Sequence, residues 1–259
     1  MIDESGHPKK GVETAGVSRQ YCGNTGKIDN CVMSVQLTAT RFDGAFRTLL
    51  ESELYIPKAW HDDRERCRAA PIPDDIVYRT KYHMALEQLD RAAAHGVRFA
   101  WITADEWYAQ KPAFLAGLEQ RGQRFVLEVP RNFAVWRHDP RSAKTDRPAT
   151  PVESLLRHSR PLMQQPWQAY RIKDTDKGPQ IWEVKFAPCW RPRGESGVGP
   201  DWLIVARNVL HRDEVKFFLS NAGAGVPLTV VLHVAFSRWS VERCLQDEKS
   251  ELGLSHFEV

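Results

Sequence analysis

Three charged residues near the end of the chain have the spacing of one helix face. Arg238, Glu242 and Lys249 are separated by four and seven positions, so on a helix all three side chains project from the same side. A carboxylate in that place can bind a metal ion while the two flanking cations bind phosphate groups. The pattern predicts metal-assisted chemistry on a phosphodiester, provided that further carboxylates lie close to Glu242.

Two carboxylates elsewhere in the chain have the sequence context of site residues. Asp3 opens the polar run DESGHPKKG, and Asp105 directly follows the apolar run VRFAWITA. Each has a structural alternative, because Asp3 can be a solvated residue near the first position and Asp105 can cap a following helix. Glu242 competes with other acids of its own segment, namely Asp247, Glu248 and Glu251.

Four segments together resemble the catalytic part of a bacterial insertion-sequence DDE transposase, in the retroviral-integrase and ribonuclease H-like superfamily. They are residues 2–11 (IDESGHPKKG), 20–23 (QYCG), 103–108 (TADEWY) and the stretch that carries Glu242. Within that superfamily the chain is similar to the insertion-sequence-four type, and in particular to the insertion sequence seven-hundred-one group. The last stretch matches a Tyr-Arg-Glu-Lys signature, except that Ala235 stands at the tyrosine position.

The resemblance implies an α/β fold of the ribonuclease H-like type, in which helices flank a mixed sheet and a β-rich insertion interrupts it. It implies a first part of the catalytic core over residues 1–131, the insertion over 132–225 and a closing part with the Glu-bearing helix over 226–259. Relative to that family we expect the chain to be truncated at both ends, because Asp3 lies close to its first residue and the final helix close to its last.

The resemblance also implies a site. Asp3, Asp105 and Glu242 would act in catalysis by binding two Mg2+ ions, with Mn2+ as a substitute. Five basic side chains would contact DNA phosphates: Arg238, Lys249, Lys9, Lys10 and His7. The structural alternatives are an exposed ion pair between Glu242 and its flanking cations, which stabilises little, and a plain surface histidine at position 7. The implied partners are double-stranded DNA, at the element ends and the target, and a second copy of the chain in a synaptic dimer.

Charge and composition are compatible with that site. The 259 residues carry a net charge of +3, but residues 131–200 hold thirteen Lys and Arg against seven Asp and Glu. Such a basic segment beside an acidic remainder favours phosphate binding, although a merely solvated surface is as good a reading without the motifs. We find no apolar run long enough for a membrane helix and no zinc-type spacing among the five cysteines. We therefore expect a cytoplasmic, nucleoid-associated protein with reduced thiols.

The elements that must position these residues are readable from periodicity and turn signals. Helices are predicted over 81–94 and 112–120, and a final helix over 237 to about 252, into which residues 226–234 lead. An Asp43-Gly44 hairpin turn is expected between the first two of the predicted strands. The strands are predicted over 31–40, 46–56, 97–103, 124–129, 167–172, 181–186, 202–206 and 215–219.

Aromatic residues are concentrated in the predicted insertion. Five of the nine tryptophans lie there among arginines: Trp136, Trp167, Trp182, Trp190 and Trp202. The resemblance implies that one insertion tryptophan stacks on a flipped DNA base next to the cleaved bond. For each tryptophan taken singly, a place in the core of the β-sheet is the more common role.

The interpretation is a DDE transposase that cleaves DNA at element ends and transfers the strands to a target. One alternative is an inactive, truncated remnant that only binds DNA, which the substitution at Ala235 favours slightly. Another is a metal-dependent nuclease without strand transfer. A glycosidase that pairs Glu242 with another carboxylate is a distant alternative, because the cations at 238 and 249 disfavour it.

Overall fold

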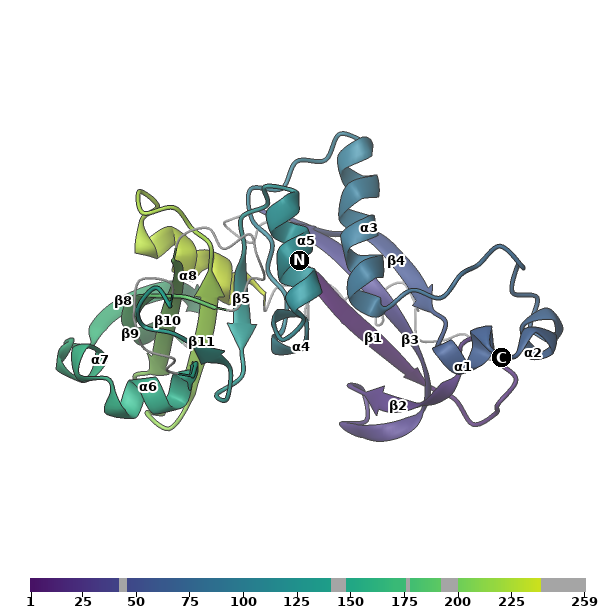
Figure 1. Cartoon of the computed structure of the whole chain (residues 1–259), viewed down its shortest axis with the longest axis horizontal. Helices are drawn as coiled ribbons and strands as arrows, with labels where there is room; N and C mark the ends of the chain where they lie inside the picture. Colours follow the sequence, from purple (N-terminus) through teal and green to yellow (C-terminus); the bar gives the residue numbers. More distant parts are fainter. Residues whose placement is uncertain (42–45, 141–147, 176–177, 192–199, 239–259) are drawn as a thin grey trace. The chain divides into compact units, whose positions relative to one another are not determined.

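The computed structural model of the chain falls into two compact units, Met1–Arg98 and Phe99–Arg238 (Figure 1). The described residues are 1–41, 46–140, 148–175, 178–191 and 200–238. Both units combine helices with antiparallel sheet, so the predicted mixed α/β class is confirmed. No helix among the described residues is long and apolar enough to cross a lipid bilayer.

The first unit is built on a four-stranded antiparallel sheet. Its long strand β3 (Lys27–Thr40) pairs with β1 (Ile2–Pro8) along one edge. Along the other edge it pairs with β2 (Ser18–Cys22) and then with β4 (Arg47–Tyr55). Asp3 lies on β1, which begins at Ile2.

Helix α3 (Lys81–Ala94) covers one face of this sheet. Its Lys81 Nζ lies 2.6 Å from Glu4 Oε2 of β1, and its Gln88 Nε2 donates to the Val35 carbonyl of β3 at 2.9 Å. Residues directly opposite each other in an antiparallel pair share a face, so Glu4 and Val35 mark the helix-covered side. Two short helices, α1 (Lys58–His61) and α2 (Arg64–Ala69), precede α3 and pack on a satellite core around Trp60.

The second unit is built on a five-stranded antiparallel sheet of order β5-β11-β10-β9-β8. It begins with two short helices and also contains a two-stranded β6-β7 ribbon. The bounds are α4 Glu106–Ala109, α5 Pro112–Gln120, β5 Val126–Val129, β6 Ala134–Val135, β7 Thr150–Pro151, α6 Val152–His158, α7 Arg160–Gln164, β8 Gln168–Thr175, β9 Gly178–Cys189, β10 Asp201–Asn208, β11 Val215–Ser220 and α8 Leu228–Ser237.

Helix α8 packs against one face of the five-stranded sheet and buries its apolar side there. Val231, Leu232, Val234 and Ala235 of the helix share a core with sheet residues that include Trp182. The Phe236 ring stacks on this surface near Trp182, at 4.9 Å between ring centroids. This packing fixes where α8 ends, and therefore where its C-terminal Arg238 lies.

Most predicted elements are confirmed, several with shifted ends. The two helices at 81–94 and 112–120 have the predicted bounds. Each of the strands predicted at 31–40, 46–56, 124–129, 167–172, 181–186, 202–206 and 215–219 overlaps an observed strand. The predicted Asp43-Gly44 turn lies outside the described residues. The division at 132 and 225 stays a prediction.

Two predictions were wrong. The apolar run 97–103 is not a strand: only Ile102 forms an isolated bridge there, to Phe125, and residues 97–100 are partly or fully exposed. The segment 226–234, predicted only to lead into the final helix, is itself helical: α8 begins at Leu228 after its N-cap Pro227, and its apolar residues pack with helical spacing. The final helix predicted from 237 to about 252 lies almost entirely outside the described residues. β-Branched residues at 229–231 made this segment look like a lead-in to the helix.

The four cysteines of the described chain are buried and are not in disulfides: Cys22, Cys31, Cys67 and Cys189. This agrees with the prediction of reduced, structural thiols. Cys244 lies outside the described residues.

Candidate functional site

Asp105 lies at the end of a short parallel pairing in the second unit. Ile102 N donates to the Arg124 carbonyl at 2.8 Å, Val126 N donates to the Ile102 carbonyl at 2.9 Å, and Glu128 N reaches the Ala104 carbonyl at 3.4 Å. Because the two segments run parallel, Asp105 and Glu128 leave them at the same end.

The carboxylate of Asp105 is held by the helix that follows it. Its Oδ1 accepts hydrogen bonds from Trp107 N at 3.0 Å and Tyr108 N at 3.3 Å, so Asp105 is the N-cap of α4. Asp105 therefore does have the structural role of a helix cap that was the alternative to a catalytic role. Capping uses one oxygen, and a carboxylate has acceptor capacity left on the other for a ligand.

Two cations lie around Glu128 on the same side of the sheet. Lys216 Nζ of β11 lies 2.9 Å from Glu128 Oε1, and Arg238 Nε lies 3.6 Å from Glu128 Oε2. Arg238 is the C-cap residue of α8, which packs on this face. Of the residues predicted from the sequence, the structure thus brings Asp105 and Arg238 together.

Burial raises the pKa of the Asp105 carboxyl above its ordinary value of 3.8, and the negative charge of Glu128 adds to the rise. The N–H groups of Tyr108 and Trp107 and the positive charge of Arg238 act in the opposite direction. The net effect is a raised pKa. The neighbouring N–H groups and Arg238 therefore offset only part of the cost of burying the negative charge of Asp105. Such a carboxylate favours the approach of a cation.

Asp3 lies on the face of the first sheet that α3 does not cover. Along β1 the side chains alternate, so Asp3, Ser5 and His7 share this face. Their partners on β3 are polar or small: Asp3 is opposite Gln36 and Ser5 is opposite Ser34. Asp3 Oδ1 accepts a hydrogen bond from the next backbone amide, at 2.8 Å.

The other residues predicted near Asp3 have ordinary surroundings. His7 Nε2 lies 3.4 Å from Ser5 Oγ. The amide of Lys9 donates to the Asn30 carbonyl at 2.8 Å, which continues the β1–β3 pairing, and the side chain of Lys10 is exposed. Phosphate binding by these three residues stays a prediction.

Glu242 and Lys249 lie outside the described residues, so the predicted one-face arrangement with Arg238 also stays a prediction. In the described part of the chain, no three His, Cys, Asp or Glu side chains are gathered closely enough to hold a metal ion. Asp3 belongs to the first unit and Asp105 to the second. Each unit therefore contains one of these two carboxylates, and each carboxylate has polar neighbours within its own unit.

Sequence reasoning missed Glu128 and Lys216. A signal for Glu128 was present, because it is the one charged residue of the strand VLEV and thus interrupts a buried apolar run. Lys216 alternates with apolar residues of β11 and resembles the solvent-facing position of any strand. Only the pairing of β11 with β5 shows that it faces Glu128.

The tryptophans of the predicted insertion mostly have structural surroundings. Trp182 is buried in the core, and Trp202 Nε1 donates to the Ala222 carbonyl at 3.1 Å. Trp136 and Trp190 bond to each other through their backbones. Trp167 differs, because Arg207 Cζ and Lys185 Nζ lie 4.1 and 4.8 Å from its ring centroid.

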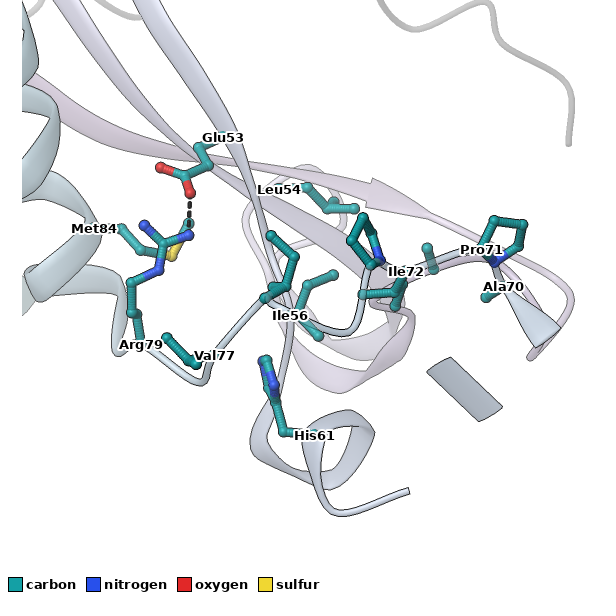
Figure 2. A pocket seen from close by; sticks show the side chains of 13 residues that line it. Glu53, Leu54, Ile56, His61, Ala70, Pro71, Ile72, Val77, Arg79 and Met84 are labelled. Carbon is teal, nitrogen blue, oxygen red and sulfur yellow. Dashed lines mark hydrogen bonds and ion pairs between the residues drawn. The ribbon is translucent and has the colours of Figure 1, made fainter. Parts of the chain in front are cut away.

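A pocket of about 320 Å³ in the first unit is unrelated to these carboxylates. Figure 2 shows its apolar wall, formed by residues such as Ile56 and Ile72, and the ion pair between Glu53 and Arg79. Among the described residues that line it, Glu53 is the one carboxylate, and it also binds Arg91 at 2.9 Å. A glycosidase-type pair of carboxylates is therefore not found in this pocket.

Sequence comparisons relate the chain to known proteins. A family described as DDE superfamily endonuclease matches residues 1–179. A protein of Microchaete diplosiphon described as "Probable transposase for insertion sequence element IS701" is 31% identical over 136 residues. The aligned region is 52% of this chain and 32% of that relative, so it spans about a third of the relative's length.

A comparison with solved structures finds a nuclease. It is the crystal structure of the NurA nuclease from Sulfolobus solfataricus, which covers 99% of this chain and 85% of that one, at 10% identity and a TM-score of 0.39. The family match, in contrast, takes in Asp3, Asp105 and Glu128 together and extends over more than half of the chain. The chain therefore belongs to the DDE superfamily endonuclease family.

Proposed function

We propose that the chain is a DDE transposase that cleaves double-stranded DNA in a metal-dependent reaction and transfers the freed strand to a target. The observation that carries the proposal is the cluster in the second unit. There a half-buried Asp105 with a raised pKa lies within electrostatic reach of Arg238, and Glu128 binds that same arginine. The family membership and the likeness to the transposase described above support the DNA substrate.

We propose Asp3, Asp105 and Glu242 as the carboxylates that hold the metal. Carboxylate oxygens are the hard ligands that Mg2+ and Mn2+ prefer, and the incompletely compensated charge of Asp105 fits such a cation. When bound, two such ions stabilise charge on the attacking and leaving oxygens of an in-line displacement and lower the pKa of bound water.

The residues of the chain have roles of their own in this reaction. The amides of Trp107 and Tyr108 fix the Asp105 carboxylate before substrate arrives, so its position does not change during the reaction. Arg238, oriented by Glu128, binds a non-bridging oxygen of the DNA phosphate next to the cleaved bond. Lys249, Lys9, Lys10 and His7 bind flanking phosphates, and no covalent protein–DNA intermediate is needed.

The fold and the assembly follow from the same proposal. The antiparallel β1, β3 and β4, followed by α3 and by the parallel pairing of Ile102 with Phe125, support a ribonuclease H-like core. The proposal also includes a β-rich insertion over 132–225 and a synaptic homodimer. The protein would act on nucleoid DNA in the cytoplasm.

The experiment is a nicking and strand-transfer assay with supercoiled plasmid carrying candidate element ends. We expect the wild-type chain to nick the plasmid with Mg2+ or Mn2+ and not with EDTA, and Asp105→Asn to be inactive. Nicking without transferred product supports a nuclease instead. DNA binding with no nicking in either protein supports an inactive remnant.

A further inference from the structure

The polar face of the first sheet contains a buried oxygen atom that has no hydrogen-bond donor within the described part of the chain. It is Oε1 of Gln36, a residue with 6% of its surface exposed. Buried acceptors are rarely left without a donor, because the loss of water is then not offset. An exception in a native fold is a reason to look for a ligand.

The rest of the Gln36 side chain is anchored. Its Nε2 lies 3.3 Å from Ser34 Oγ, and Ser34 Oγ in turn donates to the Ser5 carbonyl at 3.4 Å. With the nitrogen end held by Ser34, the oxygen end of the amide is turned away from Ser34. The orientation of the amide is therefore set by neighbours on β1 and β3.

Gln36 is the residue directly opposite Asp3 in the β1–β3 register. Directly opposite side chains lie on one face with Cβ atoms about 4.5–5.5 Å apart. A carboxylate and an amide oxygen are both acceptors, so neither can provide the hydrogen-bond donor that the other needs. Hydrated Mg2+ and Mn2+ keep several bound waters whose protons need acceptors.

We propose that Gln36 is a positioning residue for the metal that Asp3 binds: its Oε1 accepts a hydrogen bond from a water molecule of the hydrated divalent cation. This rests on the proposed function, because it requires a cation at Asp3. Gln36 would thus add a neutral oxygen to the proposed metal-binding carboxylates, and this oxygen would orient the water molecules around the cation. A role of this kind is typically worth about 10-fold to 100-fold in metal affinity.

The chain provides a matched control on the opposite face of the same sheet. Gln88 of α3 is fully buried, its Nε2 binds β3, and its Oε1 is likewise without a donor within the described residues. It lies on the helix-covered side, away from Asp3. Replacement of either glutamine by leucine removes a buried acceptor, but only one of the two changes lies next to Asp3.

The test uses the full chain and Mn2+, with the dissociation constant measured from the EPR signal of free Mn2+. We expect Gln36→Leu to weaken Mn2+ binding at least about 10-fold and Gln88→Leu to leave it within about twofold of wild type. In EDTA, Gln36→Leu should melt at the wild-type temperature or about 2–4 °C above it, because an unsatisfied polar group has been removed. Gln36→Glu, which keeps an acceptor, should bind Mn2+ at least as tightly as wild type.

Asp3→Asn separates the inference from the function on which it rests. If Asp3→Asn weakens Mn2+ binding and Gln36→Leu does not, the role of Gln36 is contradicted while the metal site stands. If Asp3→Asn has no effect either, the metal site at Asp3 is contradicted together with the inference. Should Gln36→Leu fail to fold, Gln36→Met repeats the measurement with a side chain of matched length.

Discussion

Glu128 Oε2 lies 3.6 Å from Arg238 Nε, at the point where the parallel segment that leads to Asp105 ends. Glu128 thus holds the Arg238 guanidinium near Asp105. The negative charge of Glu128 raises the pKa of Asp105, and the positive charge of Arg238 lowers it. Lys216 binds the other oxygen of Glu128 at 2.9 Å. Glu128 therefore offsets positive charge that Arg238 and Lys216 would otherwise present on this side of the sheet.

Replacement of Glu128 tests this relationship. Glu128→Gln keeps the shape of the side chain and releases Arg238 and Lys216 from their ion pairs. We expect the variant to bind DNA more tightly with a salt dependence steeper by about one phosphate contact, and to cleave more slowly because Arg238 is no longer oriented. Arg238→Ala should reduce both DNA affinity and the salt slope. An unchanged slope in both variants, measured by fluorescence anisotropy, would remove this pair from the DNA contacts.

Asp105 has a structural and a proposed catalytic role, and two substitutions separate them. Asparagine caps helices as well as aspartate, so at neutral pH Asp105→Asn should unfold at a denaturant concentration no lower than that of wild type, yet without metal-dependent cleavage. Asp105→Ala should lose cleavage and in addition about 1 kcal/mol of unfolding free energy. If Asp105→Asn still nicks plasmid DNA, Asp105 is only a cap.

The raised pKa of Asp105 predicts a pH dependence of stability in the metal-free chain. Between the ordinary value of 3.8 and the raised native pKa, the folded state binds more protons at this site than the unfolded state. The stability contribution of Asp105 therefore falls as pH rises through that window. Relative to wild type, Asp105→Asn should become more stable with rising pH. Urea unfolding in EDTA from pH 4 to 7 measures the difference, and a constant difference would contradict the pKa assignment.

Lys249 lies outside the described residues, and its role is predicted from its spacing to Arg238 and Glu242 and from the family resemblance. Lys249→Ala should weaken DNA binding and reduce the salt slope by about one, with thermal stability unchanged. Lys58→Ala is a suitable control, since that lysine forms an exposed ion pair with Asp62 in the first unit. Equal effects of the two substitutions would argue against a specific phosphate contact at 249.

Stability of the second unit depends on a buried ion pair between Arg191 and Asp201. Arg191 Nε lies 2.8 Å from Asp201 Oδ2, with 3% and 1% of the two side chains exposed, and the arginine also binds Glu119 of α5. Arg191→Ala leaves the Asp201 carboxylate buried without its cation, so we expect a loss of about 3–5 kcal/mol. The exposed pair of Arg171 and Asp174 is the control: Arg171→Ala should cost less than about 1 kcal/mol in the same chemical denaturation.

Helices and strands with clear boundaries could be predicted from the sequence. Residues 81–94 have apolar positions at helical spacing and end at His95-Gly96, with Gly96 at a positive φ of 87°. Such local signals do not depend on distant partners. The run 97–103, in contrast, needed a neighbouring strand to become one, and only Ile102 found a bridge.

The candidate site could be predicted only where a residue carried its own local signal. Asp105 follows an apolar run and precedes a helix, and this pattern is visible in sequence. Glu128 and Lys216 are 88 positions apart and meet because β11 pairs with β5. Gln36 is recognised only through the β1–β3 register, which sets it opposite Asp3.

Convergence of the three proposed metal ligands is the central claim, and metal-directed self-cleavage tests it without knowledge of the DNA ends. The purified full chain is loaded with ferrous iron, treated with ascorbate and peroxide, and its fragments are mapped by mass spectrometry. We expect cuts that cluster beside Asp3, Asp105 and Glu242 and that disappear with excess Mg2+. Scattered cuts, or none, in a chain that circular dichroism shows to be folded would contradict it.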